Sequence, residues 1–174
     1  MSWLWNELQE MFDEDDGSLP EIRVQYSSTS APVAGFQLIQ RLSETTRRAQ
    51  NAPSEPTFWS VPEQEERRVD SVPNAAALVV SGDAEPFHLV FGGIAIDGST
   101  IPDLGVFVFP DQLALSYRMG PEWGPEQVKA LFALLHELTK SDEGARLTLE
   151  DGVVPEWMDR FQGAWSQWVR EHAV

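Results

Sequence analysis

Cysteine is absent from this chain of 174 residues, and basic residues are scarce. Without cysteine, disulfides, thiol nucleophiles and thiolate-ligated metals are excluded. Only 12 Lys and Arg stand against 28 Asp and Glu, which gives a formal net charge of −16. A field of this sign repels nucleic-acid phosphates and anionic lipid headgroups. We therefore expect no nucleic-acid partner and no membrane partner, and we expect either high solubility or a basic protein partner.

The motifs of common catalytic sites are also absent. The sequence contains no G-x-x-x-x-G-K-[ST] phosphate loop, no G-x-G-x-x-G and no G-x-S-x-G nucleophile elbow. His136 and Glu137 begin a zinc-protease motif, but Lys140 stands where the second histidine is required. The other histidines, His88 and His172, lie far from His136 in sequence. We therefore predict no metal site and no cofactor, and we assign no catalytic residue.

Long apolar runs are missing too. No stretch reaches the length of a transmembrane helix, and the first residues, MSWLWNELQEMFDEDD, lack the basic and apolar regions of a secretory signal. We expect a cytoplasmic protein. With 42% hydrophobic residues and seven Trp, the chain can build one ordinary core that buries roughly 70% of its unfolded surface. We expect one domain over residues 1–174, with an irregular, proline-rich segment at about 51–74.

The clearest local signal runs from Leu104 to Lys140 and reads as strand, turn, strand, corner and helix. Because Pro110 does not suit the first position of a two-residue hairpin loop of the favoured types, we predict a three-residue loop over 110–112. That register pairs Phe109 with Leu113 and Phe107 with Leu115. One face then carries Phe107, Phe109, Leu113, Leu115 and Tyr117, and the other carries Val106 and Val108.

Helix signals flank this hairpin. Gly124 suits an N-cap and Pro125 the first helical position, with Trp123 and Val128 placed to contact each other across the helix start. A last helix is predicted at about 156–172, with Trp157, Phe161, Trp165 and Trp168 on one broad face. Further elements predicted from periodicity are a helix over 3–12, a strand over 22–26, a helix over 33–50, strands over 75–81 and 87–96, and a short strand over 147–149.

The predicted fold class is α+β. A mainly antiparallel sheet, with a meander at about 75–118, is packed by helices at about 125–140 and 156–172, and an N-terminal helix precedes it. The proline-rich segment contributes a short edge strand at Thr57–Val61. Tyr117 is expected on the packed face of the sheet.

Three places are candidates for partner binding. The first is the acidic run Asp13, Glu14, Asp15 and Asp16, which resembles the start of a calcium loop but would put Phe12 and Arg23 at the first and last ligand positions, so it is not one. The second is the pair Phe58 and Trp59 in the proline-rich segment, and the third is Trp123. Each has a structural alternative: a solvated acidic patch for the run, and packing against the core for the aromatic side chains.

Three classes of function follow. The preferred one is a non-catalytic, acidic protein-binding module for a basic partner, such as an inhibitor, an immunity protein or a chaperone; the composition is similar to that of many bacterial immunity proteins and secretion chaperones. One alternative is a small enzyme or ligand binder that uses carboxylates and histidine in a pocket of the sheet. The other is a structural subunit that self-associates, and the oligomeric state stays open.

Overall fold

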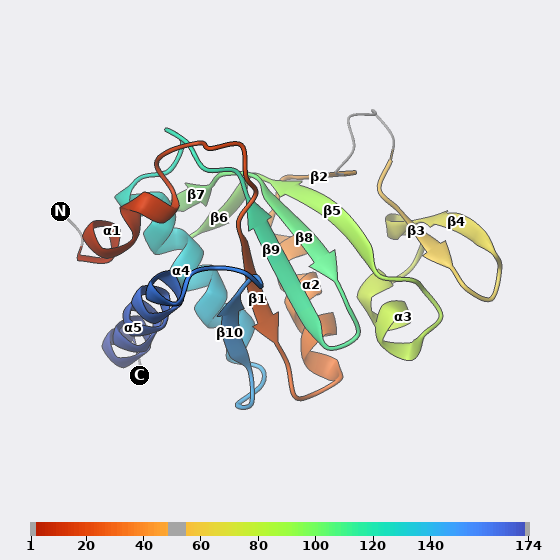
Figure 1. Ribbon diagram of the computed structural model, residues 1–174. Helices are drawn as coiled ribbons and strands as arrows, with labels where there is room; N and C mark the ends of the chain where they lie inside the picture. The colour runs from red at the N-terminus through yellow and green to blue at the C-terminus, as the bar shows by residue number, and fades with distance from the viewer. Residues whose placement is uncertain (1–2, 49–54, 173–174) are drawn as a thin grey trace.

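Six antiparallel strands form the main sheet of the computed structural model, which describes residues 3–48 and 55–172 (Figure 1). Their spatial order is β10-β1-β9-β8-β5-β2. The strands are β1 (Glu21–Gln25), β2 (Thr45–Arg48), β5 (Phe87–Gly92), β8 (Leu104–Val108), β9 (Gln112–Tyr117) and β10 (Arg146–Leu149). Strands β5, β8 and β9 follow one another in the sheet, so the predicted α+β class with a mainly antiparallel sheet is confirmed.

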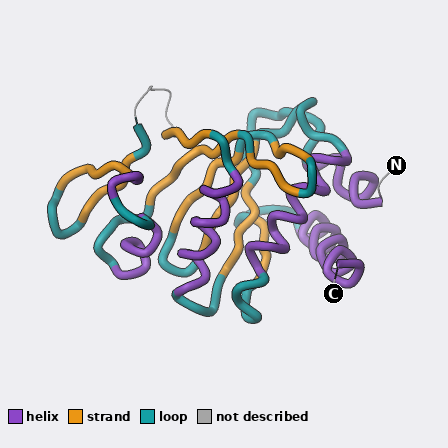
Figure 2. The backbone as a smooth tube through the Cα atoms, turned by 180° about the vertical axis from the view of Figure 1, so that it is seen from behind, coloured by secondary structure: helices purple, strands orange, loops and turns teal. Residues whose placement is uncertain are grey.

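Helices cover one face of this sheet and leave the other open. Seen from behind, α2 (Ser30–Leu42) and α4 (Pro125–Thr139) cross the back of the sheet, while none of the described helices crosses its front (Figures 1 and 2). Helices α1 (Trp3–Leu8) and α5 (Pro155–His172) lie together at one end, and a 3-10 helix (Gln9–Met11) follows α1. None of the helices within 3–48 and 55–172 combines the length and apolar character needed to cross a bilayer.

Two small hairpins complete the fold. Strands β3 (Thr57–Ser60) and β4 (Glu65–Arg68) project beside α3 (Ala75–Ser81) at the end opposite α1 and α5 (Figure 1). A 3-10 helix (Val69–Ser71) follows β4, and β6 (Ile94–Ile96) pairs with β7 (Ser99–Ile101). The predicted edge strand in the proline-rich segment is thus present as β3; the part of that segment before Glu55 lies outside the described residues.

The predicted register of the β8–β9 hairpin is wrong by one residue. Val108 pairs with Leu113 and Phe107 with Ala114, and the Phe109 N–H donates to the Gln112 carbonyl at 3.0 Å. The loop therefore has two residues. A three-residue hairpin loop usually needs a residue in the left-handed region, and the described non-glycine residues there are Gln64 and Asp97, outside this loop.

The neighbouring strand explains how the shorter loop is held. The Asp111 carbonyl in the loop accepts a hydrogen bond from the Tyr26 N–H at 2.8 Å, directly after β1. As a consequence, Val106 and Val108 face the helices together with Leu115, while Phe107 points to the open face. The assignment of the two faces is therefore the reverse of the predicted one for every residue of β8.

The segment 75–81, predicted as a strand, is helix α3. The Asn74 side chain caps its start by accepting from the Ala76 N–H at 2.9 Å, and Gly82 ends it with a φ of 87°. Both are ordinary helix signals in sequence. The predicted helix over 33–50 is also shorter than expected, because α2 ends at Leu42 and the chain continues into β2.

The two long helices are where the sequence places them. Gly124 is the N-cap of α4 and Pro125 its first residue, with Trp123 and Val128 both buried. Helix α5 buries Phe161 and Trp168, and its Trp165 is half-buried against the core. The buried side chains from both layers form one hydrophobic cluster.

Candidate functional site

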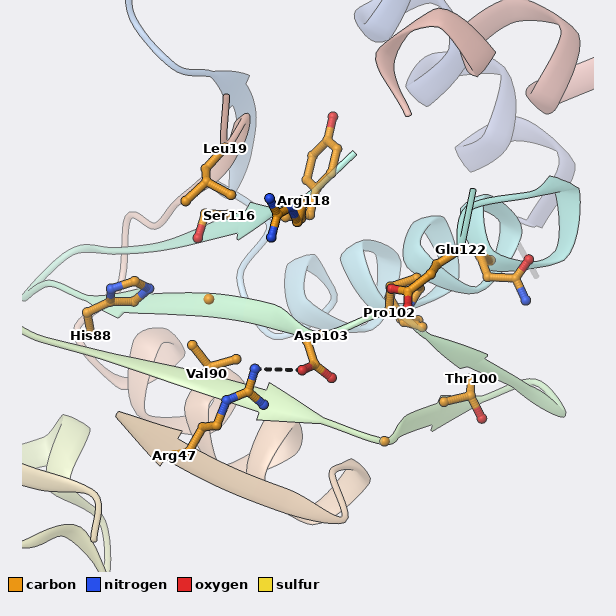
Figure 3. A pocket seen from close by; sticks show the side chains of 15 residues that line it. Leu19, Arg47, His88, Val90, Thr100, Pro102, Asp103, Ser116, Arg118 and Glu122 are labelled. Carbon is orange, nitrogen blue, oxygen red and sulfur yellow. Dashed lines mark hydrogen bonds and ion pairs between the residues drawn. The ribbon is translucent and has the colours of Figure 1, made fainter. Parts of the chain in front are cut away.

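A groove of about 830 Å³ runs over the open face of the sheet. We call it the sheet groove. Side chains from β2, β5 and β9 line it, together with the segment that leads from β7 into β8 (Figure 3). Pockets of this size with a few convergent polar groups are the usual form of small-molecule sites.

At Gly105 two neighbouring side chains fill the space that a side chain of its own would take in the floor of the sheet groove. A Cβ atom at this position would lie 2.3 Å from Ser116 Oγ and 2.5 Å from His88 Nε2. Ser116 lies across from Gly105 on β9, and His88 comes from β5 on the other side (Figure 3). The absence of a side chain at Gly105 therefore brings a hydroxyl and an imidazole to one point of the sheet.

His88 is held in a fixed orientation and in neutral form. Its ring stacks on Phe107 with 3.7 Å between centroids and 11° between planes. Burial lowers the pKa of the imidazole, and the charge of Glu21 opposes that shift only in part. Its Nε2 is buried and has no hydrogen-bond partner among residues 3–48 and 55–172. An unpaired buried polar atom costs free energy and is uncommon in native structures.

Two arginines stand at the sides of the sheet groove, each held by one aspartate. Arg47 Nη2 donates to Asp103 Oδ2 at 2.7 Å, and Arg118 Nε donates to Asp15 Oδ2 at 2.9 Å. Figure 3 shows their side chains on opposite sides of β8. Each guanidinium uses one nitrogen in its ion pair, so its other N–H groups point away from the aspartate.

A second groove, of about 350 Å³, lies between the loop after α1, the start of β1 and the start of α5. We call it the acidic groove. Its apolar lining includes Met11, Met119, Leu149, Val153 and Trp157. Five carboxylate side chains, and no basic one, complete the lining: Glu10, Glu14, Asp16, Glu21 and Glu150.

The predicted acidic run forms part of the wall of the acidic groove. Asp13, Glu14, Asp15 and Asp16 are all exposed. The Gly17 N–H donates to Asp15 Oδ1 at 2.8 Å, and that bond and Arg118 lower the Asp15 pKa. Bonds from Ser18 lower the Asp16 pKa in the same way. The run is thus an ordered loop with a stable negative charge, and two of its members face the groove.

The three predicted aromatic residues are in different places. Trp123 is 4% exposed, its centroid lies 4.9 Å from that of Phe12, and its indole N–H donates to the Arg118 carbonyl at 2.7 Å. Phe58 is 2% exposed, whereas Trp59 is 38% exposed on β3. Strand β3 lies at the opposite end of the molecule from α1, so the structure does not bring Trp59 close to the acidic run (Figure 1).

Several lining residues were not identified from the sequence. Gly105 stands inside an apolar strand, and it was the only sign there of an open position on the sheet. Glu10 comes shortly before the acidic run, whereas Glu21 begins β1 and Glu150 follows β10, so only the fold assembles the three carboxylates. No local pattern marks Ser116.

In the part of the chain that the structure describes, no group of three or more His, Asp or Glu side chains is placed to hold a metal ion. Comparison with models of known protein families, with curated protein sequences and with solved structures gave no significant match.

Proposed function

We propose that the chain is a non-catalytic, single-domain binding module of the cytoplasm that holds a basic protein partner in the acidic groove. The observation that carries this proposal is the lining of that groove: five carboxylates and no basic side chain around an apolar floor. Inhibitors, immunity proteins and chaperones for basic proteins all need a surface of this kind.

Part of the negative charge in the acidic groove is not neutralised by the residues that the structure describes. Arg160 pairs with Glu10 at 3.0 Å, and Arg23 pairs with Glu21 at 2.7 Å. The other three carboxylates, on Glu14, Asp16 and Glu150, form no ion pair with another described residue. A partner therefore meets an uncompensated negative rim.

The apolar floor adds a chemical preference to this charge. Lys and Arg side chains lay their methylene stems on apolar surface and keep the charged head in contact with water or carboxylates. Val154, which is 54% exposed, and the half-buried Trp157 offer such a surface in the same groove as Glu14 and Asp16. The occupant that fits is a segment of a partner in which Lys or Arg alternates with apolar residues. Charge speeds the encounter, and the apolar contacts lengthen the residence time.

The test uses an amphipathic peptide of Lys and Leu as probe and measures association and dissociation rates at two salt concentrations. Neutralising the rim with Glu14→Gln, Asp16→Asn and Glu150→Gln together should slow association several-fold and reduce its salt dependence. The matched control neutralises Glu63, Glu65 and Asp83, which are exposed residues outside the groove.

Equal effects of the two triple variants would show that only the overall charge matters, and the proposed site would then be wrong. A peptide that fails to bind, or whose association rate ignores salt, would contradict the function itself. The native partner, captured from the source cell, should compete with the peptide for the same three side chains.

A further inference from the structure

We propose that the sheet groove is a second binding site, independent of the acidic groove, for a small organic molecule that carries a carboxylate or phosphate group. The groove encloses about 830 Å³, which is within the range of sites for molecules of metabolite size. It lies on the open face of the sheet, which none of the helices within the described residues crosses (Figure 1).

The donors of the sheet groove define the chemical class of the ligand. Arg47 and Arg118 reach it from opposite sides of β8, and each is oriented by an aspartate that occupies one nitrogen of the guanidinium. A guanidinium has five N–H donors in a planar fork that matches two oxygens of a carboxylate or phosphate. Because both forks are already oriented, binding an oxyanion costs little side-chain entropy.

Charge in the lining is balanced locally, although the whole chain is strongly acidic. Two arginines face two carboxylates in this groove, those of Asp103 and Glu122. Asp103 is engaged with Arg47 and Asp15 with Arg118, so the oxyanion shares each guanidinium with a carboxylate that is already paired. The sheet groove is in this respect the opposite of the acidic groove, whose lining contains no cation.

The apolar part of the lining favours an organic ligand over an inorganic ion. Val90 lies on the floor, and Leu19 stands over the groove with 61% of its surface exposed. At Gly105 the floor is formed by Ser116 Oγ and the His88 ring, which occupy the space of a side chain there. The Ser116 hydroxyl can donate to an oxygen of the ligand, and the neutral His88 ring forms one wall.

Three probes of similar shape test this proposal: phenylacetate, phenyl phosphate and the uncharged phenylacetamide. Two-dimensional ¹H–¹⁵N NMR of the full chain should show shifts of the Gly105 and Ser116 amides that saturate at millimolar concentration of an anionic probe. The amide should leave these signals unchanged. The affinities of phenylacetate and phenyl phosphate are then compared. The anion that binds more tightly shows whether the site prefers a carboxylate or a phosphate.

Single substitutions test whether the NMR shifts of Gly105 and Ser116 arise from the proposed contacts. Arg47→Gln and Arg118→Gln should each weaken the binding of the anion about tenfold or more, because each removes a charge-assisted contact. Gly105→Ala should weaken binding, since its Cβ would displace Ser116 Oγ and the His88 ring from the floor of the groove. Gly163→Ala is the matched control, because a Cβ there meets no atom within 4 Å.

Equal shifts with the anions and with phenylacetamide would overturn the proposal, as would shifts that persist in both arginine variants. The absence of any shift at Gly105 and Ser116 with either anion would also overturn it. The two arginine variants keep the test decisive even where Gly105→Ala disturbs the sheet. The triple variant of the acidic groove should bind the anion as the unmodified chain does, which separates this proposal from the protein-binding function.

Discussion

Asp142 is a buried carboxylate that joins two distant parts of the chain. It accepts hydrogen bonds from the Ser27 N–H and hydroxyl, both at 2.6 Å, and from the N–H groups of Ser28 and Gly144, both at 3.0 Å. These bonds link the approach to α2 with the loop that connects α4 to β10. The bond from the Ser27 hydroxyl is the largest of the effects that lower the Asp142 pKa to about 2.

The Asp142→Asn variant should therefore be destabilised in a pH-dependent way. A carboxyl whose pKa falls from 3.8 in the unfolded chain to about 2 in the folded one stabilises the fold fully above about pH 4. This contribution is lost as the pH falls from there toward 2. Asn presents an NH₂ group to N–H donors that need an acceptor, so the variant lacks the contribution at every pH.

Thermal unfolding followed by circular dichroism should show a lower Tm for Asp142→Asn at pH 7, with a gap that narrows below pH 4. Glu143→Gln, at the exposed neighbouring position, is the control and should leave Tm nearly unchanged. A gap that stays constant down to pH 2 would contradict the assigned role of the ionised carboxylate.

Gly35 sets the distance between α2 and the sheet. A Cβ at this position would lie 2.8 Å from Tyr26 Oη and 2.9 Å from Leu113 Cδ1, and both atoms are fixed in the core. Tyr26 also donates to the Leu138 carbonyl of α4 at 3.1 Å. We expect Gly35→Ala to lower the free energy of unfolding by about 1–3 kcal/mol through overpacking. Urea denaturation measures this free energy. The control Gly163→Ala, in the exposed middle of α5, should instead raise the free energy of unfolding by about 0.5–1 kcal/mol.

At the scale of elements, α4 is the helix most deeply embedded in the core, and residues 130–135 of its sequence are all buried. Leu131 is fully buried, so Leu131→Ala should cost about 2–5 kcal/mol. Lys129→Ala, at an exposed position of the same helix, should change stability by less than about 0.5 kcal/mol. A cost below about 1 kcal/mol for Leu131→Ala, measured by chemical denaturation, would show that the helix packs more loosely than the structure indicates.

Elements whose ends or faces are marked by local sequence signals were predictable. Gly124 and Pro125 define the start of α4, and the spacing of Phe161 and Trp168 defines the buried face of α5, because these signals act within a few residues. The periodicity of the run 75–81 does not decide its structure, because a short apolar stretch fits a buried strand or a helix equally well. The capping residues Asn74 and Gly82 are the signal that distinguishes the helix.

Features that depend on distant contacts were not predictable. The Tyr26 N–H fixes the loop between β8 and β9, so the register of that hairpin depends on a strand eighty-odd positions earlier in the sequence. The same holds for the grooves: Asp13–Asp16 was visible as a charge run, but its neighbours Glu21 and Glu150 join it only in the fold. His88, Gly105 and Ser116 lie together because strands β5, β8 and β9 pair. No local sequence pattern indicates this pairing.

At the scale of the whole molecule, the helical layer on one face of the sheet must stay complete. Helix α5 contributes Phe161, Ala164 and Trp168 to the core, and Phe132 of α4 packs against both aromatic rings. We expect deletion of residues 156–174 to abolish cooperative thermal unfolding. A truncated chain that melted with the transition of the full chain would show that α5 is dispensable for the core. The double variant Arg170→Gln and Glu171→Gln, at exposed positions of α5, should melt normally.

The two outer strands of the sheet are protected in different ways. Strand β2, at one edge, has the sequence TTRR, and basic residues discourage another strand from pairing there. At the other edge, the Gln162 side chain of α5 donates to the Leu147 carbonyl of β10 at 2.6 Å. An unpaired edge is a template for a strand of another molecule. Loss of α5 should therefore expose β10 as a template for intermolecular β-sheet, with growth at β10 and a rate that rises as salt screens the net negative charge of the chain.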